Sequence, residues 1–322
     1  MKTLLQCIND LIDNVSVTDR QEDNIRNSIS NLTGYLKDKT NGLFIKEVFT
    51  NGSYERDTII RPLKDIDLFA VLKKDDWKDE HGNLPDPQTV LTKFKNYLNS
   101  INDYKDKVKQ SRPCITIELS DKDFDVLPSF EQLGGGYLIP SHDLKSWIYT
   151  YPEQLSSSLD AVHKAREYKV KPVIKVVKHW NRENSEIIPS FHIEEAAISI
   201  FLINDFKNFE TGIRLWFNNA EAYLLSIKFK SNDDYVAAIN KIKKVKDKLN
   251  EARKLYDDKK EGEAILIWKA IFDEKFPTVD VEEAKNFSKA LSEGNLKIGV
   301  TGVLSTTIGK AVPASTGFYG EK

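Results

Sequence analysis

Two aspartates at the start of an apolar run constrain the fold of this chain most strongly. Asp65 and Asp67 open the segment DIDLFAVLK, which predicts a strand from about Asp65 to Lys73. Residues i and i+2 of a strand point to the same face, so the two carboxylates lie side by side and repel each other unless a cation lies between them. The segment therefore predicts a Mg²⁺ site, because Mg²⁺ prefers hard oxygen ligands.

A second strand with the same pattern follows later in the chain. In DFDVLP, Asp123 and Asp125 share one face, and a neighbouring strand would bring one of them against Asp65 and Asp67. Three converging carboxylates could hold two Mg²⁺ ions, one beside an attacking hydroxyl and one on a triphosphate. The alternative is a solvated edge of alternating charged and apolar residues, but DIDLFAVL is too apolar for an edge strand.

A glycine–serine pair lies upstream of these aspartates. Gly52 permits a tight turn and a close backbone approach to a ligand, and Ser53 offers a hydroxyl and an amide to a phosphate oxygen. Such a pair means little alone. Twelve residues before Asp65, it favours nucleotide binding.

The chain changes character near its middle. Residues 1–150 are predicted to form an N-terminal helix and a mixed α/β domain with strands at CITIEL and DFDVLP and a helix over about Thr89 to Ile101. Residues 151–293 show helical periodicity, which predicts a helical lobe. Residues 294–322 hold six of the 15 glycines, and this composition predicts a flexible C-terminal tail.

Composition excludes several classes of protein. No run of about 18 apolar residues occurs, and Asp10 and Asp13 interrupt the short apolar start, so we expect a cytoplasmic protein without a membrane span or signal peptide. Cys7 and Cys114 lie far apart, which argues against a zinc site. A net charge of −2 argues against a protein that grips long nucleic acid.

The motif G-S-Y-x-R-x-T followed by D-I-D-L-F resembles the signature of the DNA polymerase β-like nucleotidyltransferase superfamily. The narrower resemblance is to the bacterial CD-NTases, oligonucleotide cyclases of anti-phage CBASS signalling that are related to cyclic GMP-AMP synthase. It rests on three further segments: FDVLPSF, GYLIPSHDLKSWIYTYPEQ and VIKVVKHWNRENSEIIPSFHIEEAA. The resemblance implies an α/β (α+β), bilobal fold, in which a mixed-sheet palm and a helical lobe enclose the active site.

The resemblance also implies roles for individual residues. Asp125, rather than Asp123, would join Asp65 and Asp67 as catalytic and metal ligands, with Mg²⁺ as cofactor and Mn²⁺ able to substitute. Lys178 and Ser190 would contact the triphosphate; the alternatives are a surface lysine and a helix N-cap serine near Glu194.

The implied reaction makes cyclic di- or trinucleotides from ATP and other nucleoside triphosphates. The tail KAVPASTGFYGEK resembles tails that are handled by partner proteins, so a regulatory or tail-modifying protein is the expected partner. The Cys/His cluster of the animal DNA sensor is missing, which argues against zinc-dependent DNA binding. Two alternatives stay open: an RNA-tailing enzyme similar to CCA-adding enzymes, and a noncatalytic nucleotide-binding module.

Overall fold

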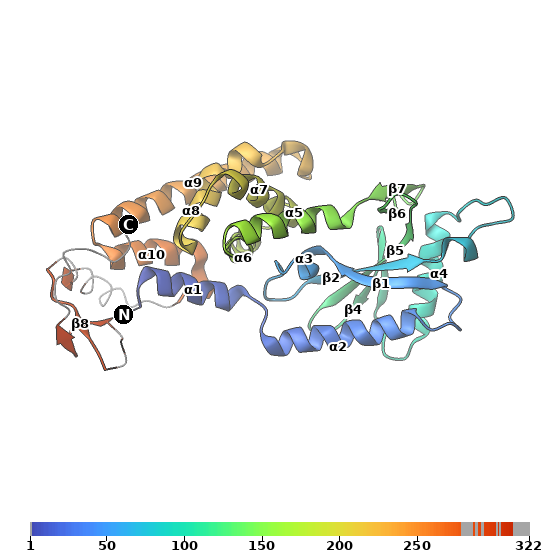
Figure 1. The fold of residues 1–322 in the computed structure, drawn as a ribbon, viewed down its shortest axis with the longest axis horizontal. Coiled ribbons are helices and arrows are strands. Elements are labelled where there is room, and N and C mark those ends of the chain that lie inside the picture. Colours follow the sequence, from blue (N-terminus) through green and yellow to red (C-terminus); the bar gives the residue numbers. More distant parts are fainter. Residues whose placement is uncertain are drawn as a thin grey trace. The chain divides into compact units, whose positions relative to one another are not determined.

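The computed structural model describes residues 2–277, 286, 289–290, 293–300, 302 and 304–311. The chain divides into two compact units (Figure 1), one made of Met1–Ser16 with Val162–Lys322 and the other of Val17–Ala161. Helix α5 (Pro152–Ala165) contains the boundary between them.

A mixed sheet forms the centre of unit Val17–Ala161. Strands β2 and β5 are parallel, and the other strand pairs of this sheet are antiparallel. The order is β1-β2-β5-β4-β3, with β6 pairing with β5 and β7 pairing with β6. The strands are β1 Ile45–Asn51, β2 Asp65–Leu72, β3 Val108–Ser111, β4 Cys114–Glu118, β5 Asp123–Glu131, β6 Tyr137–Pro140 and β7 Trp147–Thr150.

Helices pack on one face of this sheet. Apolar residues of α2 (Asp19–Leu36) and α4 (Pro87–Ser100) join alternate strand residues in one core, including Leu32, Phe94 and Phe124. The first forty residues form two helices rather than one, because Ser16 ends α1 (Leu4–Val15) and Thr18 caps α2 in a capping box with Gln21. The opposite face of the sheet carries the polar residues of β2 and β5.

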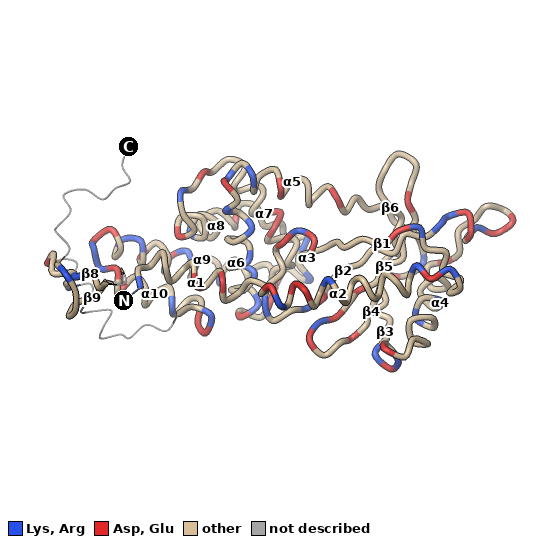
Figure 2. Tube along the Cα trace, turned by 60° about the horizontal axis from the view of Figure 1, so that its bottom comes forward, with Lys and Arg blue, Asp and Glu red and all other residues tan. Residues whose placement is uncertain are grey.

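Short elements complete this unit. Helix α3 (Gly52–Glu55) follows β1 directly and lies in the connection to β2, and the 3-10 turn η1 (Lys74–Asp76) follows β2. Lys and Arg residues are mixed with Asp and Glu residues along the traced chain (Figure 2).

The other unit is mainly helical. Helix α1 packs against α6, α8 and α10, and the Leu4 amide donates to the Glu261 carboxylate over 2.7 Å. Large buried side chains such as Trp216 and Trp268 fill the interior. The remaining helices and turns are α6 Val170–Glu183, α7 Ser190–Ile203, α8 Phe209–Tyr223, η2 Ser226–Lys228, α9 Asn232–Asp257, α10 Glu261–Phe272 and η3 Asp273–Lys275.

The predicted C-terminal tail is described only in part. Residues within 297–311 form a small antiparallel sheet of β8 (Lys297–Ile298), β9 (Leu304–Ser305) and β10 (Lys310–Ala311). Residues 312–322, which hold most of the segment KAVPASTGFYGEK, lie outside the described residues. Within the described ranges, none of the helices combines the length and apolar character needed to cross a membrane.

Candidate active site

The parallel pairing of β2 with β5 brings the aspartates of both strands together. Asp65 lies opposite Asp123 and Asp67 lies opposite Asp125 in the register. Because side chains alternate along a strand, all four carboxylates emerge on the same face of the sheet. Ile66 and Phe124, between the aspartates, point to the other face and are buried in the core.

Strand β4 adds two polar residues to this face. Thr116 lies opposite Asp125 in the antiparallel register, and its hydroxyl donates to Oδ1 of Asp125 over 2.5 Å. Cys114 precedes Thr116 by two residues, so it shares the face. Burial, and then the negative charge of Asp125, raise the pKa of the Cys114 thiol to about 12, which keeps it protonated.

Sequence reasoning missed Thr116 and Cys114. The alternation in CITIE would have placed them on one face, but it cannot say that this face is the one with the aspartates.

Asp123 has surroundings of its own. Burial raises the pKa of its carboxyl, and the nearby charges of Glu118 and Asp125 raise it further. Glu118 is the residue opposite Asp123 in the β4–β5 register. Negative charge is therefore concentrated at this end of the two strands, where a cation would relieve the repulsion.

Gly52 and Ser53 lie on α3, directly beside β2. Asn51 pairs with Asp67, and Gly52 has φ +69°. A Cβ atom added to Gly52 would overlap the Asp67 carboxylate, so only glycine fits this position without displacing it. The carbonyl of Ser53 accepts hydrogen bonds from the amides of Thr58 and Ile59, over 2.8 and 3.0 Å, which close the turn after α3.

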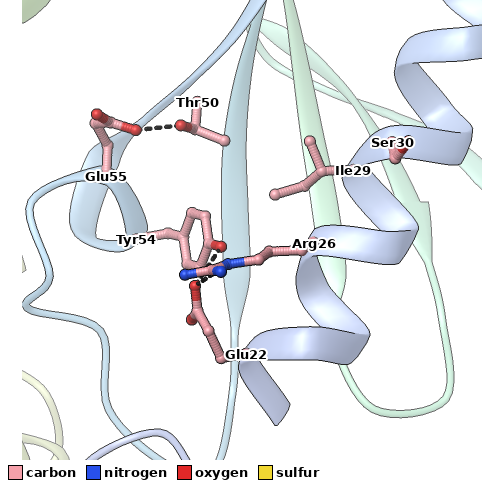
Figure 3. A pocket seen from close by; sticks show the side chains of 7 residues that line it. All are labelled: Glu22, Arg26, Ile29, Ser30, Thr50, Tyr54 and Glu55. Carbon is pink, nitrogen blue, oxygen red and sulfur yellow. Dashed lines mark hydrogen bonds and ion pairs between the residues drawn. The ribbon is translucent and has the colours of Figure 1, made fainter. Parts of the chain in front are cut away.

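Tyr54 connects α3 to α2 (Figure 3). Its hydroxyl donates to Oε1 of Glu22 over 2.9 Å, and Arg26 donates to the same oxygen over 3.0 Å. The Thr50 hydroxyl donates to the Glu55 carboxylate at the other end of α3. Burial, and then the bond to Glu22, raise the pKa of Tyr54 to about 12, so the hydroxyl remains a donor.

These contacts surround a pocket of about 430 Å³. The pocket is lined by Glu22, Arg26, Ile29, Ser30, Thr50, Tyr54 and Glu55. Sequence reasoning did not single out Tyr54, because its partner lies on a helix more than thirty residues earlier.

Lys178 and Ser190 lie in the helical unit. Lys178 on α6 is only 6% exposed, and its ammonium donates to Glu194 on α7 over 2.6 Å, where Glu194 is fully buried. The alternative of a surface lysine is therefore wrong. Ser190 is the first residue of α7, and Pro189 occupies the N-cap, so the alternative of an N-cap serine is also wrong.

A family model matches the part of the chain that carries the carboxylates. The model is described as the Second Messenger Oligonucleotide or Dinucleotide Synthetase domain, SMODS, and it matches residues 1–162, half of the chain. The chain belongs to the SMODS family.

Relatives of this SMODS chain are themselves nucleotide synthases by name. It is 33% identical over 144 residues to the cyclic AMP-AMP-AMP synthase of an Acinetobacter strain, covering 42% of this chain and 39% of that protein. The chain also matches a probable cyclic nucleotide synthase of Bacillus cereus over 56% of that protein's length. It matches the cyclic AMP-AMP-AMP synthase of Escherichia coli over 66% of that protein's length.

Solved structures share the fold at low identity. The chain aligns with CdnC from an E. coli CdnC:HORMA-deltaN complex with a TM-score of 0.67 and 16% identity, covering 85% of this chain and 98% of that one. It aligns with Vibrio cholerae DncV cyclic AMP-GMP synthase, bound to the linear intermediate 5′ pppA(3′,5′)pG, with a TM-score of 0.64 and 14% identity, covering 87% and 98%. The predicted mixed α/β fold and the resemblance to bacterial CD-NTases are both confirmed.

The donor set suits a hard divalent cation. Among the residues that the structure describes, no three His, Cys, Asp or Glu side chains already gather as a metal-binding group. The fit rests instead on placement: Asp67 and Asp125 are register neighbours, Asp65 shares their face, and their donors are carboxylate oxygens. The Asp67 carboxylate lies against the turn at Gly52, where a Cβ atom would overlap it, so glycine at this position lets Asp67 keep its place among the carboxylates.

Proposed function

We propose that this SMODS-family chain is a metal-dependent nucleotidyltransferase that joins nucleoside triphosphates through the α-phosphate into a cyclic di- or trinucleotide. The pairing of Asp67 with Asp125 across two parallel strands carries the proposal. It puts carboxylates from separate segments beside each other, where they could hold the divalent cations that assist transfer of a nucleotidyl group from a triphosphate to a hydroxyl, with pyrophosphate as the leaving group.

Each site residue has a chemical task in this proposal. Asp65, Asp67 and Asp125 would hold Mg²⁺ or Mn²⁺, which neutralises triphosphate charge and favours ionisation of the attacking hydroxyl. Asp125 accepts the proton of that ribose hydroxyl. Gly52 lets the backbone approach the nucleotide closely, and Ser53 donates to a phosphate oxygen.

Lys178 and Ser190 are proposed to contact the triphosphate. An ammonium neutralises phosphate charge, and a hydroxyl in the first turn of α7 can donate to an oxygen. The bond from Lys178 to Glu194 would orient the ammonium.

ATP is the first substrate to test, because the Acinetobacter relative is named a cyclic AMP-AMP-AMP synthase. Other nucleoside triphosphates are also proposed, since DncV is named a cyclic AMP-GMP synthase. The biological setting that we propose is anti-phage CBASS signalling in the cytoplasm. A regulatory protein partner is proposed with it, since CdnC was solved with a HORMA protein.

The test is product analysis with radiolabelled ATP, Mg²⁺ or Mn²⁺, and mass spectrometry. We expect a phosphatase-resistant small product from the wild-type chain and none from the double variant Asp65→Asn with Asp67→Asn, which should still fold. A charge-matched control, Asp75→Asn with Asp76→Asn in η1, should retain activity. Wild-type levels of product from the Asp65 and Asp67 double variant would refute the site, and label transferred to added transfer RNA would indicate an RNA-tailing enzyme instead.

A further inference from the structure

Thr116 on β4 donates its hydroxyl to the carboxylate of Asp125 in the candidate site. Its Oγ1 lies 2.5 Å from Oδ1 of Asp125, and the residue is only 8% exposed. Thr116 also pairs with Lys109 of β3 on its other side, so its backbone is held between two strands. A β-branched side chain has few χ1 rotamers, so the hydroxyl has a defined direction.

We propose that Thr116 is a positioning residue that orients the carboxylate of Asp125 for a divalent cation shared with Asp65 and Asp67. This inference rests on the proposed function. The hydroxyl engages one oxygen of Asp125 and limits rotation of the carboxylate about its χ2 angle, which leaves Oδ2 to face a cation. Mg²⁺ demands near-ideal octahedral geometry and Mn²⁺ takes similar oxygen-ligand sites, so a carboxylate with a defined orientation binds them more tightly than one that rotates.

Cys114 is the second residue of β4 on the face that carries Asp125. It precedes Thr116 by two residues on β4, so it shares the face that lies beside Asp125, and it is only 9% exposed. Such outer partners of a metal ligand contribute about 10- to 100-fold to metal affinity in other proteins.

The test measures metal binding directly. Free Mn²⁺ is followed by electron paramagnetic resonance during titration of the full chain without nucleotide, which would itself chelate Mn²⁺. We expect Thr116→Val, which keeps the shape but removes the donor, to weaken Mn²⁺ affinity about 10- to 100-fold. Thr116→Ser should restore it. Thr116→Ala, whose fold is checked by circular dichroism, repeats the test if the valine variant does not fold.

Ser129→Ala is the matched control for loss of a hydroxyl. Ser129 lies on β5, on the same face as Asp125, and its buried hydroxyl has no hydrogen-bond partner within the described residues. This variant should bind Mn²⁺ like the wild type.

The outcomes separate the two proposals. Wild-type Mn²⁺ affinity in both Thr116→Val and Thr116→Ala would overturn the role of Thr116 while leaving the proposed function intact. The double variant Asp65→Asn with Asp67→Asn should bind Mn²⁺ more weakly than the wild type. Wild-type Mn²⁺ affinity in that variant would overturn both the role of Thr116 and the proposed function. A second readout is the Mg²⁺ concentration for half-maximal turnover, which should rise in Thr116→Val while kcat at saturating Mg²⁺ recovers.

Discussion

The Cα atom of Gly52 lies so close to Asp67 that an added Cβ would sit 2.7 Å from Asp67 Cγ and overlap one carboxylate oxygen. Gly52 also has φ +69°, a conformation that costs residues with a side chain about 1–2 kcal/mol. The turn at Gly52, between β1 and β2, therefore packs directly against the carboxylate of Asp67. A change at Gly52 has to displace either the turn or Asp67.

We predict that Gly52→Ala lowers the free energy of unfolding by about 1–2 kcal/mol and abolishes nucleotide turnover, because the methyl group displaces the Asp67 carboxylate. Gly82→Ala is the control, since Gly82 has φ +82° but no atom near an added Cβ. It should share the backbone cost and keep full turnover. Chemical unfolding measures the free energy of unfolding of both variants, and product formation measures their turnover. An active Gly52→Ala chain would contradict the prediction.

The hydrogen bond from the Tyr54 hydroxyl to the Glu22 carboxylate holds α3 against α2 (Figure 3). We expect Tyr54→Phe to cost about 1 kcal/mol of stability, the usual net contribution of one hydrogen bond. Turnover should fall between about 10- and 100-fold, because a small displacement of Gly52 and Ser53 misplaces the substrate.

Tyr35→Phe is the matched control for that variant. Tyr35 also donates its hydroxyl to a carboxylate, that of Asp103, over 2.7 Å, but it lies on α2 away from α3. Its loss should leave turnover unchanged. Equal turnover of the Tyr54 and Tyr35 variants would show that the Tyr54 bond does not position α3.

The buried pair of Lys178 and Glu194 predicts a large stability effect. Lys178→Ala should cost about 3–5 kcal/mol, because it leaves the buried Glu194 charge without the ammonium. Lys178→Met combined with Glu194→Leu should recover most of that loss, since apolar residues of similar volume can replace a buried ion pair. Urea unfolding of the single and double variants measures the coupling.

The same double variant tests the triphosphate role of Lys178. If Lys178 contacts phosphate, the stable double variant should bind ATP more weakly than the wild type in equilibrium dialysis. Unchanged ATP affinity in a folded double variant would remove Lys178 from the nucleotide site.

Glu261 predicts a pH dependence of stability in the helical unit. Burial raises the pKa of its carboxyl above the usual 4.5, while the bond from the Leu4 amide acts in the opposite direction. The folded chain therefore binds this proton more tightly than the unfolded chain, so stability from this group falls as pH rises from 4.5 through the folded pKa.

Replacing Glu261 by glutamine should remove that dependence. Glu261→Gln keeps an acceptor for the Leu4 amide, so we expect higher stability than wild type at pH 7 and a difference that shrinks toward pH 4.5. Glu263→Gln, on the same helical turn, is the control for the chemical change itself. Unfolding free energies at pH 7 and pH 5 decide between these outcomes.

Much of the α/β unit was predictable because its signals are local. The capping box of Thr18 with Gln21, the helix near Thr89 to Ile101 and the strands at DIDLFAVL and DFDVLP follow from spacing and residue type. The single predicted N-terminal helix is two helices in the structure, because Ser16 ends α1 and Thr18 caps the start of α2.

The sequence by itself determined which side chains share a face: alternation puts Asp65 with Asp67, and Asp123 with Asp125, whatever the strands pair with. Only the tertiary structure decided that β2 and β5 are parallel neighbours, that Thr116 reaches Asp125, and that Lys178 is buried against Glu194. The physical reason is that strand pairing and helix packing join segments far apart in the chain, and their register depends on how the whole core is filled.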